Sequence, residues 1–139
     1  MILIANEIIE TLENSTFTIP VSSVKEFYDI NKIECPQIAI NELPSNEGVY
    51  LDNQPFIVQN IFTVEIYSKQ MIVSGTPYNK RKAAIIIALE VDKILNETYG
   101  LTMQGPIQAA PYEDETIFRA VMNYMAYIDT RTDKIYRSL

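Results

Sequence analysis

The stretch VQNIFTVEIYS, residues 58–68, decides the fold class, because its apolar side chains fall at every second position. Phe62, Val64 and Ile66 share this spacing, which places them on one face of a β-strand and predicts that this face is buried. A second strand is predicted over residues 116–129, TIFRAVMNYMAYID. This strand is apolar on both faces, so we expect it to be central in the sheet.

Two further strands are predicted beside this pair. Ile38 and Ile40 alternate with polar or small residues after Pro36, and a proline suits the first position of a strand. Residues 101–110 are predicted to form another strand, joined to the 116–129 strand by an acidic turn.

The segments between and after these strands are predicted to be connections. Residues 43–57, LPSNEGVYLDNQPFI, contain two prolines and a glycine, and predict a long loop or a projecting hairpin around Asp52 and Asn53. Long ordered loops in compact domains are often functional. Residues 69–75 are predicted to be a connection, and the tail from residue 130 either extends the last strand or projects.

A helix is predicted near the start of the chain. Residues 2–13 place their apolar side chains on one face and turn most of their glutamates away, as an amphipathic helix requires. Ser23 and Glu26 have the spacing of a capping box, which predicts a short helix over residues 24–30.

The longest helix is predicted over residues 77–98, about six turns at the standard pitch. Thr76 and Pro77 supply a cap and a first-position proline, and Gly100 lies where a C-terminal cap belongs. The middle of this helix is apolar nearly all round, which a helix covering a small sheet does not require. A second layer of this chain or another subunit must cover the residues off the inner stripe, which form a candidate subunit interface: Ile85, Ile86 and Leu89.

These elements describe an α+β domain: a mainly antiparallel sheet of about four or five strands, packed by an N-terminal helix and one long helix. The length of 139 residues predicts a single domain, residues 1–139, with a projecting loop at 43–57 and a C-terminal tail from 130.

Composition argues against catalysis and against nucleic-acid binding. The chain has no histidine, which removes the usual general base near neutral pH and the commonest metal ligand. Its net charge of −7 disfavours a surface that grips phosphate backbones or anionic membranes. Cys35, the single cysteine, is expected to be a small buried apolar residue. Residues 1–14 resemble neither a signal peptide nor a transit peptide, so an intracellular product is expected.

Two charged clusters are candidate sites. Residues 113–115 are consecutive acids, for which a solvated turn is favoured over a cation site because neighbouring extended residues point to opposite faces. Lys80, Arg81 and Lys82 lie in the first turns of the long helix, where they oppose the helix dipole. They are candidates for gripping an acidic partner surface, although a solvated helix face is favoured. No phosphate-binding glycine motif is present, and no enzymatic activity, metal or cofactor is predicted.

Three stretches occur in a characteristic order: residues 38–69 (IAINELPSNEGVYLDNQPFIVQNIFTVEIYSK), 76–95 (TPYNKRKAAIIIALEVDKIL) and 112–129 (YEDETIFRAVMNYMAYID). Together they resemble the tail-completion proteins of long-tailed bacteriophages, in particular the tail terminator family. The most telling piece is the 112–116 turn that leads into Ile117, Phe118 and Arg119, with Tyr124 further on.

The resemblance implies a structural subunit that assembles as a hexameric ring on the head-proximal end of the tail tube. Such a ring stops tube growth and joins the tube to the neck or connector protein, and in contractile tails it also meets the last sheath disc. The implied location is the virion tail, assembled in the host bacterial cytoplasm. DNA passes through such a ring without specific binding, and no cofactor or catalytic residue is implied.

Partner contacts are expected on the 43–57 loop, the 69–76 connection, the start of the long helix and the C-terminal tail. The candidate contact residues are Tyr50, Leu51, Asp52, Asn53, Gln54, Lys80, Arg81, Lys82, Lys134, Tyr136 and Arg137.

Two alternatives remain open from the sequence. One is another neck component, such as a head-closure or stopper protein. The other is a small-molecule-binding α+β domain, which requires a concave pocket with convergent polar groups.

Overall fold

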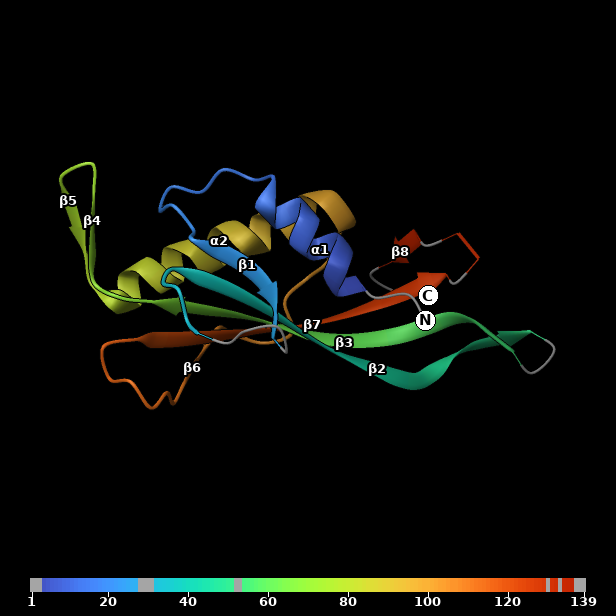
Figure 1. Cartoon of the computed structure of the whole chain (residues 1–139). Helices are drawn as coiled ribbons and strands as arrows, with labels where there is room; N and C mark the ends of the chain where they lie inside the picture. Colours follow the sequence, from blue (N-terminus) through green and yellow to red (C-terminus); the bar gives the residue numbers. More distant parts are fainter. Residues whose placement is uncertain (1–3, 28–31, 52–53, 130, 133, 137–139) are drawn as a thin grey trace.

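The computed structural model describes residues 4–27, 32–51, 54–129, 131–132 and 134–136, with the backbone alone for residues 44–51 and 54–56 (Figure 1). The elements follow in this order: α1 (Ile4–Glu13), β1 (Ser23–Glu26), β2 (Gln37–Leu51), β3 (Gln54–Ser68), β4 (Met71–Val73), β5 (Thr76–Tyr78), α2 (Lys80–Tyr99), β6 (Gln108–Ala110), β7 (Phe118–Asp129) and β8 (Lys134–Tyr136).

The main sheet has the strand order β1-β2-β3-β7-β6, and β8 also pairs with β7. All of its pairs are antiparallel except β1 with β2, which run parallel. β3 occupies the centre, and its residues 57–68 pair with residues 118–129 of β7. The predicted α+β class with a mainly antiparallel sheet is therefore confirmed.

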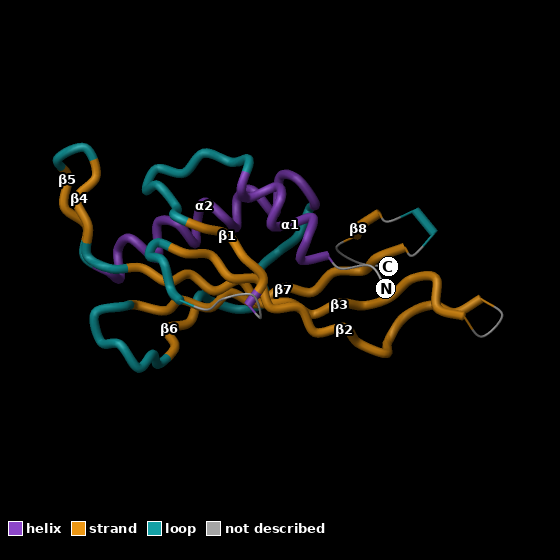
Figure 2. The backbone as a smooth tube through the Cα atoms, viewed as in Figure 1, coloured by secondary structure: helices purple, strands orange, loops and turns teal. Residues whose placement is uncertain are grey.

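Both helices cover the same face of the main sheet (Figure 1; Figure 2). α1 contacts β1 and β2, whereas α2 contacts β3 and β7. The even-numbered residues of β2 up to Glu42, of β3 from Val58 and of β7 point to this face because side chains alternate along a strand. Most of them are buried, including Ile38, Ile40, Phe62, Val64, Ile66, Met122, Tyr124 and Ile128.

Tyr124 joins the sheet to α2. Its ring stacks on Phe62, with the two centroids 5.2 Å apart and 13° between the ring planes. Its hydroxyl donates a 2.7 Å hydrogen bond to Asp92 Oδ1 on α2. Burial and the neighbouring Asp92 carboxylate raise the pKa of Tyr124, so the hydroxyl stays protonated and remains a donor. These contacts fix the position of α2 on the sheet.

A smaller apolar cluster covers one end of the opposite face of the sheet. Tyr67 lies in this cluster, and Tyr112 meets it edge-on with ring centroids 5.4 Å apart. Cys35 packs there as the predicted apolar residue, although it is half-buried, and burial raises the pKa of its thiol. The full cluster consists of Ile33, Cys35, Ala39, Tyr67, Tyr112 and Ile117.

Glu42, a buried residue of β2, caps the start of α1. Its two carboxyl oxygens accept hydrogen bonds from the backbone N–H groups of Ile4, at 3.1 Å, and Ala5, at 3.2 Å. Asn60 Nδ2 of β3 donates a further hydrogen bond to Oε2. The first N–H groups of a helix have no partner within the helix, so a carboxylate from the sheet satisfies them and complements the helix dipole.

α2 begins three residues later than predicted. Asn79, rather than Thr76, is its N-cap, because the Asn79 side chain accepts a 2.7 Å hydrogen bond from the Lys82 N–H. Thr76 and Pro77 belong instead to β5. The predicted end is confirmed: Gly100 adopts a left-handed conformation, with φ at 70°, and its N–H bonds to the last turn.

The short helix predicted over residues 24–30 is wrong over residues 24–26, and residues 28–30 lie outside the described part of the chain. Residues 23–26 form strand β1 and pair in parallel with residues 37–40 of β2. Ser23 Oγ is buried without a hydrogen-bond partner in the described structure, so it does not cap a helix. Pairing with a strand distant in sequence and the burial of Val24 outweigh the local capping signal.

The long loop predicted over residues 43–57 is mostly strand. β2 and β3 continue through it as paired strands, with Leu51 opposite Gln54. The hairpin alternative is the correct one, and its turn, Asp52 and Asn53, lies outside the described residues. We call residues 44–56 the arm, because they project beyond the end of β7 (Figure 1).

Three other connections also differ from the predictions. The 69–75 connection contains β4, which forms a separate two-stranded sheet with β5. Of residues 101–110, only Gln108–Ala110 form a strand, β6. The tail neither extends β7 nor projects over residues 134–136, since β8 folds back onto β7. Strands of three residues carry no readable periodicity, which is why the sequence did not predict them.

We expect Glu42→Ala to lower the free energy of unfolding by about 1–3 kcal/mol, because buried N–H donors and the Asn60 amide lose their acceptor. Glu42→Gln should cost less, since it keeps one acceptor oxygen. Chemical denaturation at matched pH measures both.

The same carboxyl should give a pH signature. Burial raises the pKa of Glu42 above its ordinary value of 4.5, against the lowering effect of the hydrogen bonds from Ala5, Ile4 and Asn60. A raised folded-state pKa means that this group contributes most at low pH and that the contribution is lost as the pH rises through the folded pKa. Wild type should therefore gain stability relative to Glu42→Gln as the pH falls from neutral towards 4.5. A difference that does not change with pH would contradict this assignment.

Candidate interaction surface

The face of the sheet opposite the helices carries exposed apolar side chains near the base of the arm. Leu43, Ile61 and Met125 are direct neighbours across β2, β3 and β7. Leu43 is 52% exposed and Ile61 is 43% exposed. Tyr127, two residues after Met125 on β7, lies on the same face and is paired with Tyr136 of β8. We call these five residues the open-face patch.

Gln59 lies within the open-face patch and is itself buried. Its Nε2 lies 2.8 Å from Met125 Sδ and donates a 3.3 Å hydrogen bond to the Tyr127 hydroxyl. No member of the patch carries a formal charge. Exposed apolar surface with polar but uncharged groups is typical of the central part of a protein–protein contact.

An ion pair separates the open-face patch from the smaller apolar cluster. Arg119 Nε donates a 2.6 Å hydrogen bond to Glu65 Oε1, and Nη2 donates to the same oxygen. Glu65 is buried, and the Arg119 guanidinium lies 6.0 Å from the centroid of the Tyr67 ring. The two charges neutralise each other, so this part of the face has a structural role.

The predicted subunit interface on α2 is only partly exposed. Leu89 is 55% exposed, whereas Ile85 and Ile86 are half-buried. Ile86 packs against the main core, so the subunit itself covers part of this surface. Leu89, together with Ile85 one turn before it, remains on the side of α2 that faces away from the sheet.

The predicted arm contacts lie at its tip, at the end of the molecule opposite the β4–β5 hairpin (Figure 1). Tyr50 and Leu51 end β2, and Gln54 begins β3. Asp52 and Asn53 lie outside the described residues.

The predicted basic cluster lies at the start of α2. Lys80 Nζ donates a hydrogen bond to the Glu115 carbonyl oxygen. Lys82 Nζ lies 5.6 Å from the centroid of the Tyr78 ring, and Arg81 is exposed. The cluster is therefore tied to its surroundings at Lys80 and Lys82, and most open at Arg81.

The predicted tail contacts lie on β8 beside the open-face patch. Lys134 Nζ lies 5.2 Å from the centroid of the Tyr136 ring, which is itself in the patch. Arg137 lies outside the described residues.

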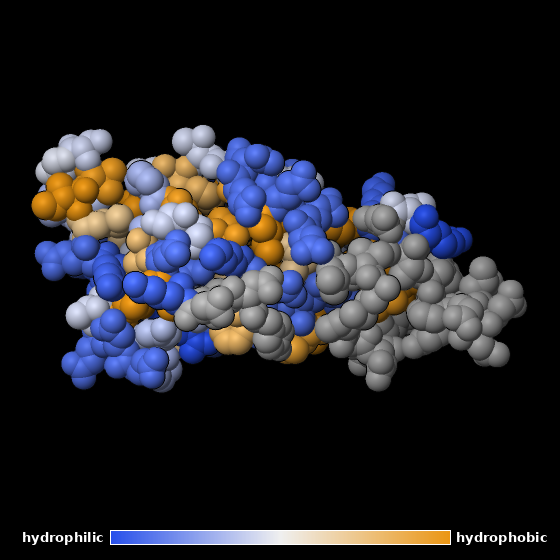
Figure 3. Space-filling view, viewed as in Figure 1, coloured by the Kyte–Doolittle hydropathy of each residue, from blue (hydrophilic) through white to orange (hydrophobic). Residues whose placement is uncertain are grey.

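The β4–β5 hairpin exposes an apolar residue that the sequence analysis did not single out. Ile72 is 72% exposed, opposite Pro77 in the pairing of the two strands. Figure 3 shows apolar residues gathered at this hairpin, in contrast to the hydrophilic residues over α1. The strand propensity of residues 71–73 favours an extended segment here, but no local pattern indicates that Ile72 is exposed.

The acidic residues 113–115 form an exposed turn, as favoured from the sequence. Asp114 Oδ1 accepts hydrogen bonds from the Thr116 N–H, at 2.9 Å, and the Thr116 hydroxyl, at 2.6 Å, and these bonds lower the pKa of Asp114. Within the described ranges, no group of three or more Cys, Asp or Glu residues is arranged to hold a metal ion. Neither described helix has the length and hydropathy needed to cross a lipid bilayer.

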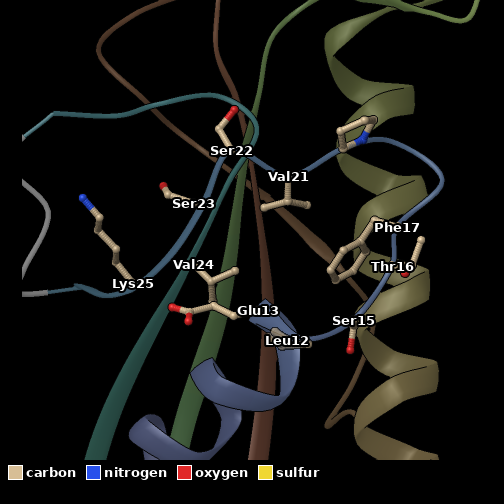
Figure 4. A pocket seen from close by; sticks show the side chains of 11 residues that line it. Leu12, Glu13, Ser15, Thr16, Phe17, Val21, Ser22, Ser23, Val24 and Lys25 are labelled. Carbon is tan, nitrogen blue, oxygen red and sulfur yellow. The ribbon is translucent and has the colours of Figure 1, made fainter.

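A groove of about 650 Å³ lies between the end of α1, the α1–β1 connection and β1 (Figure 4). Phe17, Val21 and Val24 give it an apolar wall, and serine and threonine residues line much of the rest. The charged lining residues are Glu13 and Lys25. The groove is open to solvent and lacks a convergent set of buried polar groups, which a small-molecule site requires.

No protein-family model and no curated protein sequence matches this chain. The candidate surfaces therefore rest on the geometry alone. Sequence reasoning missed Leu43, Ile61 and Met125 as a group. The alternation of side chains within each strand indicates which of them share a face. Leu43, however, fell in the predicted loop, and the pairing register between the strands was unknown.

Ile61 and Phe62 offer a matched test, because they are neighbours on opposite faces of β3. Phe62→Ala should lower the free energy of unfolding by roughly 3–5 kcal/mol, since Phe62 is fully buried against Tyr124. Ile61→Ser should change it by much less and should reduce binding of a dye that reports exposed apolar surface. Denaturation and dye fluorescence measure the two effects. Equal destabilisation by both variants would mean that the patch belongs to the core.

Proposed function

We propose that this chain is a subunit of a ring that caps the head-proximal end of a phage tail tube, as tail terminator proteins do. The observation that carries the proposal is the placement of exposed apolar side chains towards opposite ends of one small domain. The open-face patch lies near the base of the arm, and Ile72 lies on the β4–β5 hairpin at the other end (Figure 1).

A ring subunit in a tail needs more contact surfaces than a monomeric protein does. It meets two neighbouring copies, a tube below and a neck component above. Closed rings use heterologous contacts, in which two different patches of one subunit meet. The open-face patch, the Leu89 side of α2 and the Ile72 hairpin are three separate apolar surfaces on one chain, which suits such a subunit.

The charge balance supports the same proposal. Phosphate binding gains its free energy from the release of counterions by basic groups, and a chain with net charge −7 has little to gain from it. A ring through which DNA slides must not hold the DNA.

The proposed partners are a second copy of this chain, the tail tube protein, a neck or connector protein and, in a contractile tail, the last sheath disc.

Tube assembly in vitro tests the proposal. A tail tube protein from the same genome is polymerised with and without this chain, and tube lengths and ends are recorded by electron microscopy. Wild type should halt elongation and leave one ring at one end of each tube. Tubes that keep growing with uncapped ends would contradict the proposal.

Shortening the arm tests where the tube contact lies. Replacing residues 51–54 with Asn-Gly keeps a two-residue turn between Tyr50 and Pro55, so the subunit should still fold. This variant should fail to cap tubes, whereas Glu113→Gln in the exposed acidic turn should cap them as wild type does. Normal capping by the shortened variant would remove the arm from the tube contact.

A further inference from the structure

The β4–β5 hairpin is covered on one face only: Met71, Val73 and Tyr78 pack against the main core, whereas Ile72 is exposed. It forms a two-stranded sheet separate from the main sheet and projects beside the start of α2 (Figure 1). A two-stranded hairpin alone is marginally stable in water. Burial of Ile72, which is 72% exposed, against another surface would therefore stabilise the hairpin as well as the contact.

The groove beside β1 has the opposite character. Its apolar wall of Phe17, Val21 and Val24 opens to solvent, and none of its lining residues comes from the hairpin of the same subunit. Figure 4 shows these three side chains around the hollow, with Glu13 next to Val24. An apolar tip and an apolar groove thus occur on one chain at separate places.

The charges beside these two features are complementary. Arg81 and Lys82 are exposed in the first turn of α2, just after the hairpin, where the positive end of the helix dipole disfavours them. Glu10 and Glu13 are exposed in the last turn of α1, where the negative end disfavours them. Of the two, Glu13 lines the groove, together with the basic Lys25, so the end of α1 makes the surroundings of the groove acidic on one side. Within the described part of the chain, no ion pair engages Arg81, Lys82, Glu10 or Glu13.

We propose that the hairpin of one copy inserts Ile72 into the β1-side groove of the next copy, with Arg81 and Lys82 of the first facing Glu10 and Glu13 of the second. The occupant is a second copy of this chain, because the basic start of α2 beside the hairpin complements the acidic end of α1 beside the groove. The contact joins two different patches, so it leaves a free hairpin at one end and a free groove at the other. Such a contact continues from copy to copy until a ring closes.

The inference rests on the proposed ring for its biological setting, but the purified chain tests it without a tube. Wild type should self-associate in analytical ultracentrifugation. The double variant Arg81→Glu/Lys82→Glu, and separately Glu10→Lys/Glu13→Lys, should weaken self-association at least about tenfold, because like charges then face each other. Each reversal favours the dipole of its own helix, so thermal stability should be kept or raised.

The decisive measurement mixes the two charge-reversed variants in equal amounts. Every contact between unlike variants is again complementary, so assemblies of wild-type size should return. Ile72→Asp should abolish self-association, whereas the control Gln108→Asp, at an exposed residue of β6 that no proposed contact uses, should leave it unchanged. A monomeric wild type, a mixture that stays dissociated, or assembly that survives Ile72→Asp would overturn the contact.

The two proposals fail in different ways. Rings that depend on Ile72 but never bind tube ends would keep this contact and refute the tail function. Tube capping that is unaffected by Ile72→Asp and by both charge reversals would keep the function and refute this contact.

Discussion

The pairing of β3 with β2 on one side and β7 on the other is the constraint on which the rest of the structure depends. Because β3 is paired along most of its length, its successive side chains alternate between the two faces of the sheet. Phe62, on one face, stacks on Tyr124, and Tyr124 in turn holds α2 through Asp92. Ile61, on the other face, is left outside the helix layer. A slip of one residue would exchange these roles, so the core and the open-face patch are specified by the same register.

The sequence predicts the elements that repeat a local pattern over many residues. The alternation around Phe62 and the spacing of Ile38 and Ile40 give the long strands, and Gly100 gives the end of α2, because each signal lies within its own element. β1 was missed because its partner lies more than ten residues away and the Ser23–Glu26 spacing imitates a helix cap. The exposure of Ile61 and Leu89 depends on which face the helices cover, and only the tertiary structure decides that.

Helix dipoles connect the fold to the proposed contacts. At the start of α1, the Glu42 carboxyl lies at the positive end of the helix and accepts hydrogen bonds from its free N–H groups, so its oxygens are used within the subunit. At the end of α1, Glu13 lies at the negative end and has no such use. The start of α2 carries Arg81 against the positive end. The Glu42 hydrogen bonds stabilise the folded subunit, whereas Glu13 and Arg81 each lie at the helix end that has their own sign. Because Glu13 and Arg81 have opposite charges, a contact between copies that brought them together would offset both unfavourable interactions with the helix dipoles.

Two kinds of apolar exposure occur in this subunit, and they have different consequences. Leu43 and Ile61 lie on a sheet that is already rigid, so burying them removes apolar area from water with little loss of conformational freedom. Ile72 lies on the outer face of a hairpin that pairs with no strand of the main sheet and packs on the core through Met71, Val73 and Tyr78. The open-face patch offers several neighbouring apolar side chains to a partner, whereas the outer face of the hairpin offers chiefly one. A contact centred on one apolar side chain gains less from apolar burial and depends more on the charges beside it. Arg81 and Lys82 at the base of the hairpin would supply those charges in the proposed contact, whereas the open-face patch has no formal charge of its own.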